Sequence, residues 1–159
     1  MKEFNSLEEK VIWKLKEKGF HVTCAESCTG GMIASTLVNV AGVSEVFEES
    51  FVTYANSAKR RLLGVEEGAL QLYGAVSSQV ARQMAEGAAK KAGAQAAVAV
   101  TGIAGPDGGT PEKPVGLVYI GCSVAGKTVV TENRFQGDRM EIRRQTVRAA
   151  LELLYDCLN

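Results

Sequence analysis

The sequence predicts an α/β domain in which helices flank a mixed sheet in three layers, including one antiparallel hairpin. Three observations lead to this fold class. Helical and strand patterns alternate along most of the chain. Residues 96–101 are small and β-prone, as in a strand that is covered on both faces. Only residues 125–127 separate the last two strands, which favours a hairpin. Since the chain has 159 residues, we expect one domain spanning 1–159.

The first predicted elements are a helix, a strand and a second helix. A capping-box pattern at Ser6–Glu9 starts the first helix, and Gly19 is a natural stop. Residues 21–25 predict a short strand, and residues 32–40 predict an apolar helix. The polar, glycine-containing turn at 26–31 lies between them. A strand, a turn and a helix in this order display backbone N–H groups at the helix start.

The middle of the chain alternates strand and helix again, with Gly64 and Gly74 as breaks. The predicted elements are, in order, a strand at 51–54, a helix at 57–63, an alanine-rich helix from Ser77 to about Gly93, and the strand at 96–101.

The last third contains the longest loop, the hairpin and a final helix. Residues 102–114 hold all three prolines, so they cannot form regular structure. A loop of this length in a compact domain is typically functional or disordered. Strands are predicted at 115–124 and 128–135, and Asp138 with Glu141 matches a capping pair for the last helix.

The composition excludes several function classes. Eighteen Lys+Arg balance eighteen Asp+Glu, so no global positive field favours a nucleic-acid partner. No apolar run approaches the ~18–20 residues of a membrane span, and the first ten residues are too charged for a signal peptide. We therefore expect a cytoplasmic protein without membrane contact. His21 is the only histidine and the four cysteines form no C-x-x-C pair, so we expect free, packed thiols, no metal and no cofactor.

Residues 121–128, GCSVAGKT, match the G-x-x-x-x-G-K-[ST] pattern of a phosphate-binding loop. Such a loop lies between a strand and a helix, because the helix N-terminus helps to hold the phosphates. Here Val129, Val130 and Thr131 follow, and these residues favour a strand. We therefore interpret the match as a hairpin turn.

The turn at 25–31, AESCTGG, is the strongest local candidate for chemistry. Ser27 lies where a strand gives way to a helix, and turn amides there could form an oxyanion hole. The alternative is an ordinary capped helix start. Cys28 is a rival nucleophile with higher intrinsic reactivity. No neighbouring group in the sequence lowers its pKa, so we interpret it as a packed thiol.

A serine nucleophile needs a base. His21 begins the strand that ends near Ser27, so about six residues of extended chain, ~20 Å, separate the two. A lysine or a tyrosine remains, as in Ser-Lys hydrolases. An ordinary lysine, with a pKa of ~10.4, is almost fully protonated at neutral pH, and lowering that pKa to ~7.4 requires ~4 kcal/mol. Lys59 is a candidate if it is buried, whereas its neighbours Arg60 and Arg61 could equally indicate a solvated helix face.

Five separated motifs resemble the CinA carboxy-terminal domain family, the nicotinamide-nucleotide amidases. They are AESCTGG at 25–31, YANSAKRRLLGV at 54–65, TGIAGPDGG at 101–109, KPVGLVYIG at 113–121 and GDR at 137–139. The resemblance covers essentially the whole chain. It implies an α/β domain that hydrolyses the carboxamide of nicotinamide mononucleotide, giving nicotinate mononucleotide and ammonia in pyridine nucleotide recycling. Many relatives carry an additional amino-terminal domain that this chain lacks, so we expect none of that domain's activities.

The family's motif serine, tyrosine and lysine fall on Ser27, Tyr54 and Lys59, and Ala55 replaces a serine common in the family. The resemblance thus selects Ser27 as nucleophile, with Lys59 as base and Tyr54 relaying a proton or orienting Lys59; the assignment of the base between these two stays open.

The implied binding residues lie in several segments. Backbone amides of Thr29, Gly30 or Gly31 would stabilise the oxyanion. Three places could hold the phosphate: the helix start at Gly30–Gly31, the loop beginning at Gly102, and Arg139. Asn56 could bond the carboxamide or hold its own turn, and Thr101 could form a polar wall or be an ordinary buried strand residue. Arg139 could instead form a surface pair with Asp138.

Two other functions remain at this point. The chain could be a non-catalytic nucleotide-binding or regulatory module, since some relatives are named for competence or DNA damage, or an amidase for another small amide. We further expect a homo-oligomer, a dimer.

Overall fold

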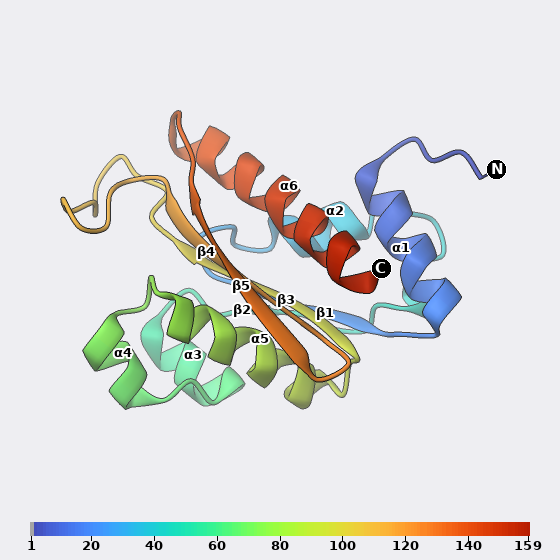
Figure 1. Cartoon of the computed structure of the whole chain (residues 1–159), viewed down its shortest axis with the longest axis horizontal. Helices are drawn as coiled ribbons and strands as arrows, with labels where there is room; N and C mark the ends of the chain where they lie inside the picture. Colours follow the sequence, from blue (N-terminus) through green and yellow to red (C-terminus); the bar gives the residue numbers. More distant parts are fainter. Residues whose placement is uncertain (1) are drawn as a thin grey trace.

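The computed structural model describes residues 2–159, and it has helices on both faces of one sheet (Figure 1). The sheet order is β2-β1-β3-β4-β5. The strands are β1 (Val22–Glu26), β2 (Phe51–Val52), β3 (Ala96–Gly102), β4 (Leu117–Val124) and β5 (Lys127–Arg134). Strand β1 pairs in parallel with β2 and β3, whereas β4 pairs antiparallel with β3 and β5. The predicted mixed sheet with one hairpin is confirmed.

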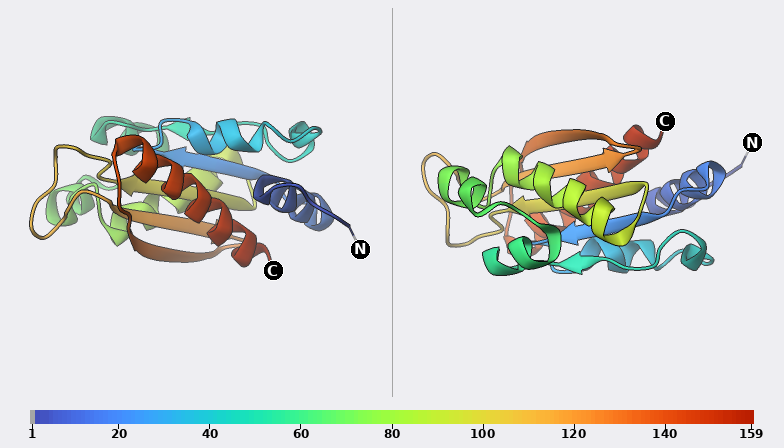
Figure 2. Two further views of the ribbon diagram at one scale, coloured as in Figure 1. Left: turned by 90° about the horizontal axis from the view of Figure 1, so that it is seen from above. Right: turned by 90° about the horizontal axis from the view of Figure 1, so that it is seen from below.

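Two groups of helices form the outer layers. Helices α1 (Leu7–Lys18), α2 (Met32–Leu37) and α6 (Arg139–Leu158) cover one face, and α3 (Asn56–Leu63), α4 (Glu67–Tyr73) and α5 (Ser78–Ala92) cover the other (Figure 2). A short 3₁₀ helix, η1 (Val43–Glu45), lies between α2 and β2. Within residues 2–159, no helix is both long and apolar enough to cross a bilayer.

The helix starts follow the predicted capping patterns. The Ser6 side chain accepts from the Glu9 amide, and the Ser77 side chain accepts from the Val80 amide. A complete capping box joins Asp138 to Glu141 at the start of α6. The two-residue turn between β4 and β5 has positive φ at both Ala125 and Gly126, which confirms the hairpin in place of a phosphate-binding loop.

Three elements differ from their predicted boundaries by two or more residues, and two elements were not predicted. Helix α2 ends at Leu37 and not at residue 40. Strand β2 spans only two residues, and the carbonyls of Thr53 and Tyr54 that follow it bind the Lys59 ammonium. Helix α4 was not predicted: Leu72 and Tyr73 are exposed, so the segment lacks a clear apolar face. The short helix η1 was also not predicted, and β4 begins two residues later than expected.

The parallel strands end at one edge of the sheet. From β1 the chain passes through α2 on one face to reach β2, and from β2 it passes through α3, α4 and α5 on the other face to reach β3. Where connections leave opposite faces, a crevice forms at the carboxyl ends of the strands. Ser27, Thr53 and Gly102 all lie at this edge.

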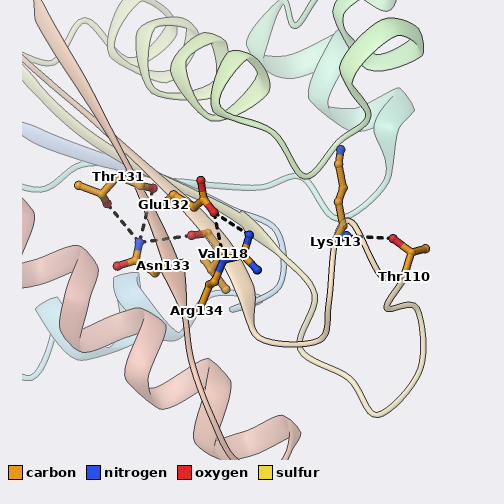
Figure 3. Close-up of polar contacts among 7 residues, drawn as sticks. All are labelled: Thr110, Lys113, Val118, Thr131, Glu132, Asn133 and Arg134. Carbon is orange, nitrogen blue, oxygen red and sulfur yellow. Dashed lines mark hydrogen bonds and ion pairs between the residues drawn. The ribbon is translucent and has the colours of Figure 1, made fainter.

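The loop between β3 and β4 is anchored beside this edge. The Lys113 amide donates to the Thr110 hydroxyl (Figure 3), and the Thr110 amide donates to the Lys113 carbonyl. The Lys113 ammonium reaches the carbonyl of Tyr73 at the end of α4. Behind the loop, Glu132 pairs with Arg134, and the Asn133 amide donates to the carbonyl of Val118. Through Lys113, the loop that leads into the β4–β5 hairpin is attached to the end of α4.

The contact between α3 and α5 requires a glycine. A Cβ atom at Gly87 would lie 1.9 Å from the carbonyl oxygen of Leu63. We expect Gly87→Ala to lower the free energy of unfolding by about 1–3 kcal/mol, because the helices must separate. Gly68→Ala is the matched control: nothing lies within 4 Å of its new Cβ, so it should stabilise helix α4 by about 0.5–1 kcal/mol. Denaturant unfolding of both variants measures the difference, and equal stabilities would contradict this packing.

Candidate active site

Ser27 and Lys59 form a buried pair at the carboxyl end of β1. The Lys59 Nζ lies 3.1 Å from the Ser27 Oγ, 2.9 Å from the carbonyl oxygen of Thr53 and 3.3 Å from that of Tyr54. Lys59 is 1% exposed and Ser27 is 8% exposed. Lys59 lies on the inner face of α3 with Leu63. The two residues are 32 positions apart in the sequence, and the short β2 strand brings them together.

The surroundings of Lys59 favour its neutral form. Burial lowers the pKa of Lys59 from its ordinary value, and the nearby Cys28 thiol opposes this effect. A neutral amine has two N–H donors and one lone pair. The ammonium form donates from Nζ to the Ser27 hydroxyl and to both carbonyls. In the neutral form the two N–H groups can bind the two carbonyls, and the lone pair can then accept the hydroxyl proton of Ser27. Within residues 2–159 no carboxylate forms an ion pair with Lys59.

The buried carboxylate of Glu26, the residue before Ser27, binds groups at the start of α2. The Glu26 side chain accepts from the Thr29 hydroxyl at 2.6 Å and from the amides of Ile33 and Ala34 at 2.9 and 3.0 Å. It therefore occupies the start of α2, where the sequence suggested a phosphate. The Ile33 and Ala34 amides at this helix start are therefore already bound, which weighs against a phosphate there.

Gly30 and Gly31 shape the backbone turn into α2 and do not line the cavity. The Gly30 amide already donates to the carbonyl of Ser27 at 3.1 Å, so it is not an open oxyanion donor. Gly30 and Gly31 both have positive φ, which allows the tight turn into α2. Thr29 is fully buried and its hydroxyl is bound to Glu26. Its backbone N–H donates to no acceptor within residues 2–159.

A cavity of about 210 Å³ opens beside the Ser27–Lys59 pair. Seven of the residues expected at the site line it: Ser27, Tyr54, Asn56, Lys59, Thr101, Gly102 and Arg139. Thr29, Gly30 and Gly31 do not line it. Its remaining wall includes Ala75, Val76 and Ala104, which sequence reasoning missed because small apolar residues carry no chemical signal.

Two of the three expected phosphate positions, Arg139 and the loop that begins at Gly102, are in contact with each other. Its guanidinium donates to the carbonyl of Gly105 at 2.7 Å and to the Tyr54 hydroxyl at 3.2 Å. Arg139 forms no ion pair with Asp138, whose side chain caps α6 instead. The loop after β3 and Arg139 therefore form one continuous rim of the cavity.

Three further residues have defined partners. The Tyr54 side chain is 62% exposed, and its hydroxyl contacts Arg139, whereas only its carbonyl reaches Lys59; this geometry favours Lys59 as the base. The Thr101 hydroxyl donates to the carbonyl of Ala75 at 2.9 Å and so fixes the cavity wall. Asn56 is the exposed first residue of α3.

The two rival groups are poorly suited to catalysis. Burial raises the pKa of the Cys28 thiol to about 11, so it is protonated at neutral pH. His21 precedes the opposite end of β1, and its Nε2 lies 3.5 Å from Glu48. The four cysteines are free thiols, three of them buried. Within residues 2–159, no three His, Cys, Asp or Glu side chains come together as metal ligands.

The fold and the site thus define an α/β domain with a serine–lysine pair at the carboxyl ends of parallel strands. The model of the CinA C-terminal domain matches residues 4–158, and the chain belongs to this family.

Known relatives agree in sequence and in structure. A CinA-like protein from Kosmotoga olearia is 52% identical over 149 residues, which are 94% of this chain and 36% of that protein, so the chain spans about a third of the relative's length. The crystal structure of the competence/damage inducible protein CihA from Agrobacterium tumefaciens is 48% identical, with a TM-score of 0.91, over 100% of this chain and 99% of that one. A CinA superfamily protein from Escherichia coli is 33% identical, with a TM-score of 0.89, over 98% and 94% of the two chains.

Proposed function

We propose that this protein hydrolyses the carboxamide of nicotinamide mononucleotide to nicotinate mononucleotide and ammonia. The observation that carries the proposal is the buried contact of 3.1 Å between the Ser27 hydroxyl and the Lys59 amine at the edge of a cavity. A lysine whose pKa is lowered by burial can, in its neutral form, activate a serine without a histidine. The family resemblance supplies the substrate.

The reaction starts at the amide carbon. Ser27 Oγ attacks this carbon, its proton passes to Lys59 Nζ, and the carbonyl π electrons move to the amide oxygen. The tetrahedral intermediate collapses, the C–N bond breaks, and the nitrogen takes the proton from Lys59 to leave as ammonia. Water then attacks the acyl-enzyme and gives a proton to Lys59. The bond between the acyl carbon and Ser27 Oγ breaks, Lys59 returns the proton to Ser27 Oγ, and nicotinate mononucleotide is released.

The charge on the amide oxygen needs donors. The N–H groups of Cys28 and Thr29, the two residues after Ser27, are suited to this role because neither has an acceptor on another residue of the described chain, whereas the Gly30 amide is already bound. Cys28 lines the cavity, and Thr29 is the next residue of the turn. One such donor typically contributes about 3–4 kcal/mol to the transition state. The mechanism uses no metal ion and no cofactor.

Arg139 and the loop after β3 would hold the substrate phosphate at the cavity rim. We expect Arg139→Ala to raise KM for the mononucleotide about tenfold to a hundredfold, since a hydrogen bond to a charged group contributes about 1.5–3 kcal/mol. The riboside, which lacks the phosphate, is the matched control and should show little change in KM. Steady-state kinetics with both substrates measure this, and an equal loss for the two would place the phosphate elsewhere.

The proposed function is tested by ammonia release from nicotinamide mononucleotide in the presence of EDTA, with the nucleotide product identified by chromatography. Free nicotinamide and other small amides, run in parallel, test the substrate assignment. Turnover of the mononucleotide alone supports the proposal. Binding of the mononucleotide without turnover would support the nucleotide-binding module instead. The expected homodimer stays a prediction, which sedimentation would test.

A further inference from the structure

A second arginine of α6 contacts the turn that follows the nucleophile. The Nε of Arg143 donates to the carbonyl of Cys28 at 3.0 Å, and its Nη2 donates to the carbonyl of Thr29 at 3.1 Å. The guanidinium fork thus holds two successive carbonyls across a sequence separation of more than one hundred residues. Arg143 does not line the cavity, so it does not belong to the substrate contacts described above.

The contacts of Arg143 go to the backbone alone. No carboxylate lies within ion-pair distance of Arg143 in the described chain, although the side chain is partly buried. An arginine that served only to keep the surface of α6 polar would not need to bind two backbone carbonyls. The neighbouring Arg144 is exposed and has no hydrogen bond within residues 2–159. The difference between these adjacent arginines indicates a specific role for Arg143 at the turn.

The peptide geometry explains what this contact does. In a trans peptide the C=O and the following N–H point in opposite directions. Because Arg143 draws the Cys28 carbonyl towards α6, the Thr29 N–H of the same peptide must point away from α6. The next peptide follows the same rule: Arg143 holds the Thr29 carbonyl, and the Gly30 N–H points back to the carbonyl of Ser27. Because the Ser27 carbonyl is held in this way, the Cys28 N–H of the same peptide must point in the opposite direction.

We propose that Arg143 is a positioning residue that fixes the directions of the Cys28 and Thr29 N–H groups as oxyanion donors. This inference rests on the proposed role of Ser27 as nucleophile, but not on the identity of the amide. Glu26 holds the Thr29 side chain from the start of α2, while Arg143 holds the backbone from α6. The turn is therefore clamped from two elements, and its donors are oriented before substrate binds. An oriented donor stabilises the transition state more than the bound substrate.

The test uses a small fluorophosphonate that labels Ser27 whatever the natural substrate is. Ser27 Oγ forms a bond to phosphorus, the P–F bond breaks, fluoride leaves, and Lys59 takes the hydroxyl proton. The phosphoryl oxygen takes the oxyanion position in this reaction. We expect Arg143→Ala to slow labelling about tenfold to a hundredfold, because one oxyanion donor is worth about 10²–10³ in rate. Arg143→Lys, which can hold one carbonyl, should give an intermediate rate, and Arg144→Ala should react as the wild type does.

Further readouts separate positioning from a general loss of structure. Millimolar ethylguanidinium should restore part of the labelling rate of Arg143→Ala and leave Arg144→Ala unchanged. With nicotinamide mononucleotide, Arg143→Ala should lower kcat while KM stays near the wild-type value. Thermal unfolding shows whether each variant is folded, and Arg143→Lys retains the test if the alanine variant is not.

The outcomes distinguish a failure of the proposed amidase function from a failure of the proposed role of Arg143. If the wild type is labelled at Ser27 but releases no ammonia from the mononucleotide, the proposed function is wrong and the labelling rates still test Arg143. If folded Arg143→Ala or Arg143→Lys is labelled at the wild-type rate, the inference about Arg143 is overturned. If Ser27 of the wild type is not labelled at all, the oxyanion role and the nucleophile are both overturned.

Discussion

Ser27→Ala should lower ammonia release from nicotinamide mononucleotide by about 10⁴-fold or more, leaving the fold intact. Removing the nucleophile of a hydrolase typically has an effect of this size, because the remaining site can only orient and polarise the amide. The change removes one hydroxyl that lies at the edge of a cavity, so we expect the free energy of unfolding to change little. Activity assays with circular dichroism on the same samples measure both quantities.

Cys28→Ala is the matched control for this prediction. The thiol lies next to Ser27 and lines the same cavity, but burial raises its pKa to about 11. It is therefore protonated at neutral pH and a poor nucleophile. We expect Cys28→Ala to retain most of the turnover. Full activity of Ser27→Ala together with an inactive Cys28→Ala would transfer the nucleophile to Cys28.

Lys59→Met should also abolish turnover, and the wild type should show why in its pH dependence. The base acts only when neutral, so kcat/KM rises with pH as Lys59 loses its proton and levels off above its pKa. Burial lowers that pKa below the ordinary value of 10.5, so the plateau begins at a lower pH than for an ordinary lysine. Lys91→Met, which changes an exposed lysine of α5, should leave the profile unchanged. A profile that still rises above pH 10.5 would contradict the lowered pKa.

The same lowered pKa predicts a pH effect on stability. Between the folded pKa of Lys59 and the unfolded value of 10.5, the unfolded chain binds more protons at this site than the folded chain does. The free energy of unfolding contributed by Lys59 therefore increases with pH across this window. Below the folded pKa, the buried ammonium is a constant penalty. The unfolding free energy of the wild type minus that of Lys59→Met should thus increase with pH across this window. A difference that stays flat or decreases would contradict the lowered pKa of Lys59.

Local patterns predicted most of the elements. The caps at Ser6, Ser77 and Asp138 bind amides three residues away, so the pattern and the partner are both visible in a short window. The hairpin was predicted for the same reason, since its two strands are consecutive. Helix α4 was missed because its Leu72 and Tyr73 face solvent and give no apolar period. This segment packs against α5, and that contact is not visible in the apolar pattern of the segment itself.

The candidate site divides in the same way. The sequence by itself determined that Ser27 follows a strand, and it left only a lysine or a tyrosine as the base of the proposed mechanism, because the single histidine is at the other end of that strand. The family motifs selected Lys59, but the sequence could not show that it is buried. Only the tertiary structure decided that Lys59 reaches Ser27, that Glu26 fills the helix start expected to hold phosphate, and that Arg143 holds the nucleophile turn.

The physical reason is the range over which each interaction acts. Capping, turn and periodicity preferences act between residues a few positions apart, so they can be read from the chain. The site contacts join residues separated by 32, 85 and 115 positions. Their partners, and with them the desolvation that lowers the pKa of Lys59, exist only after the helices have packed on the sheet.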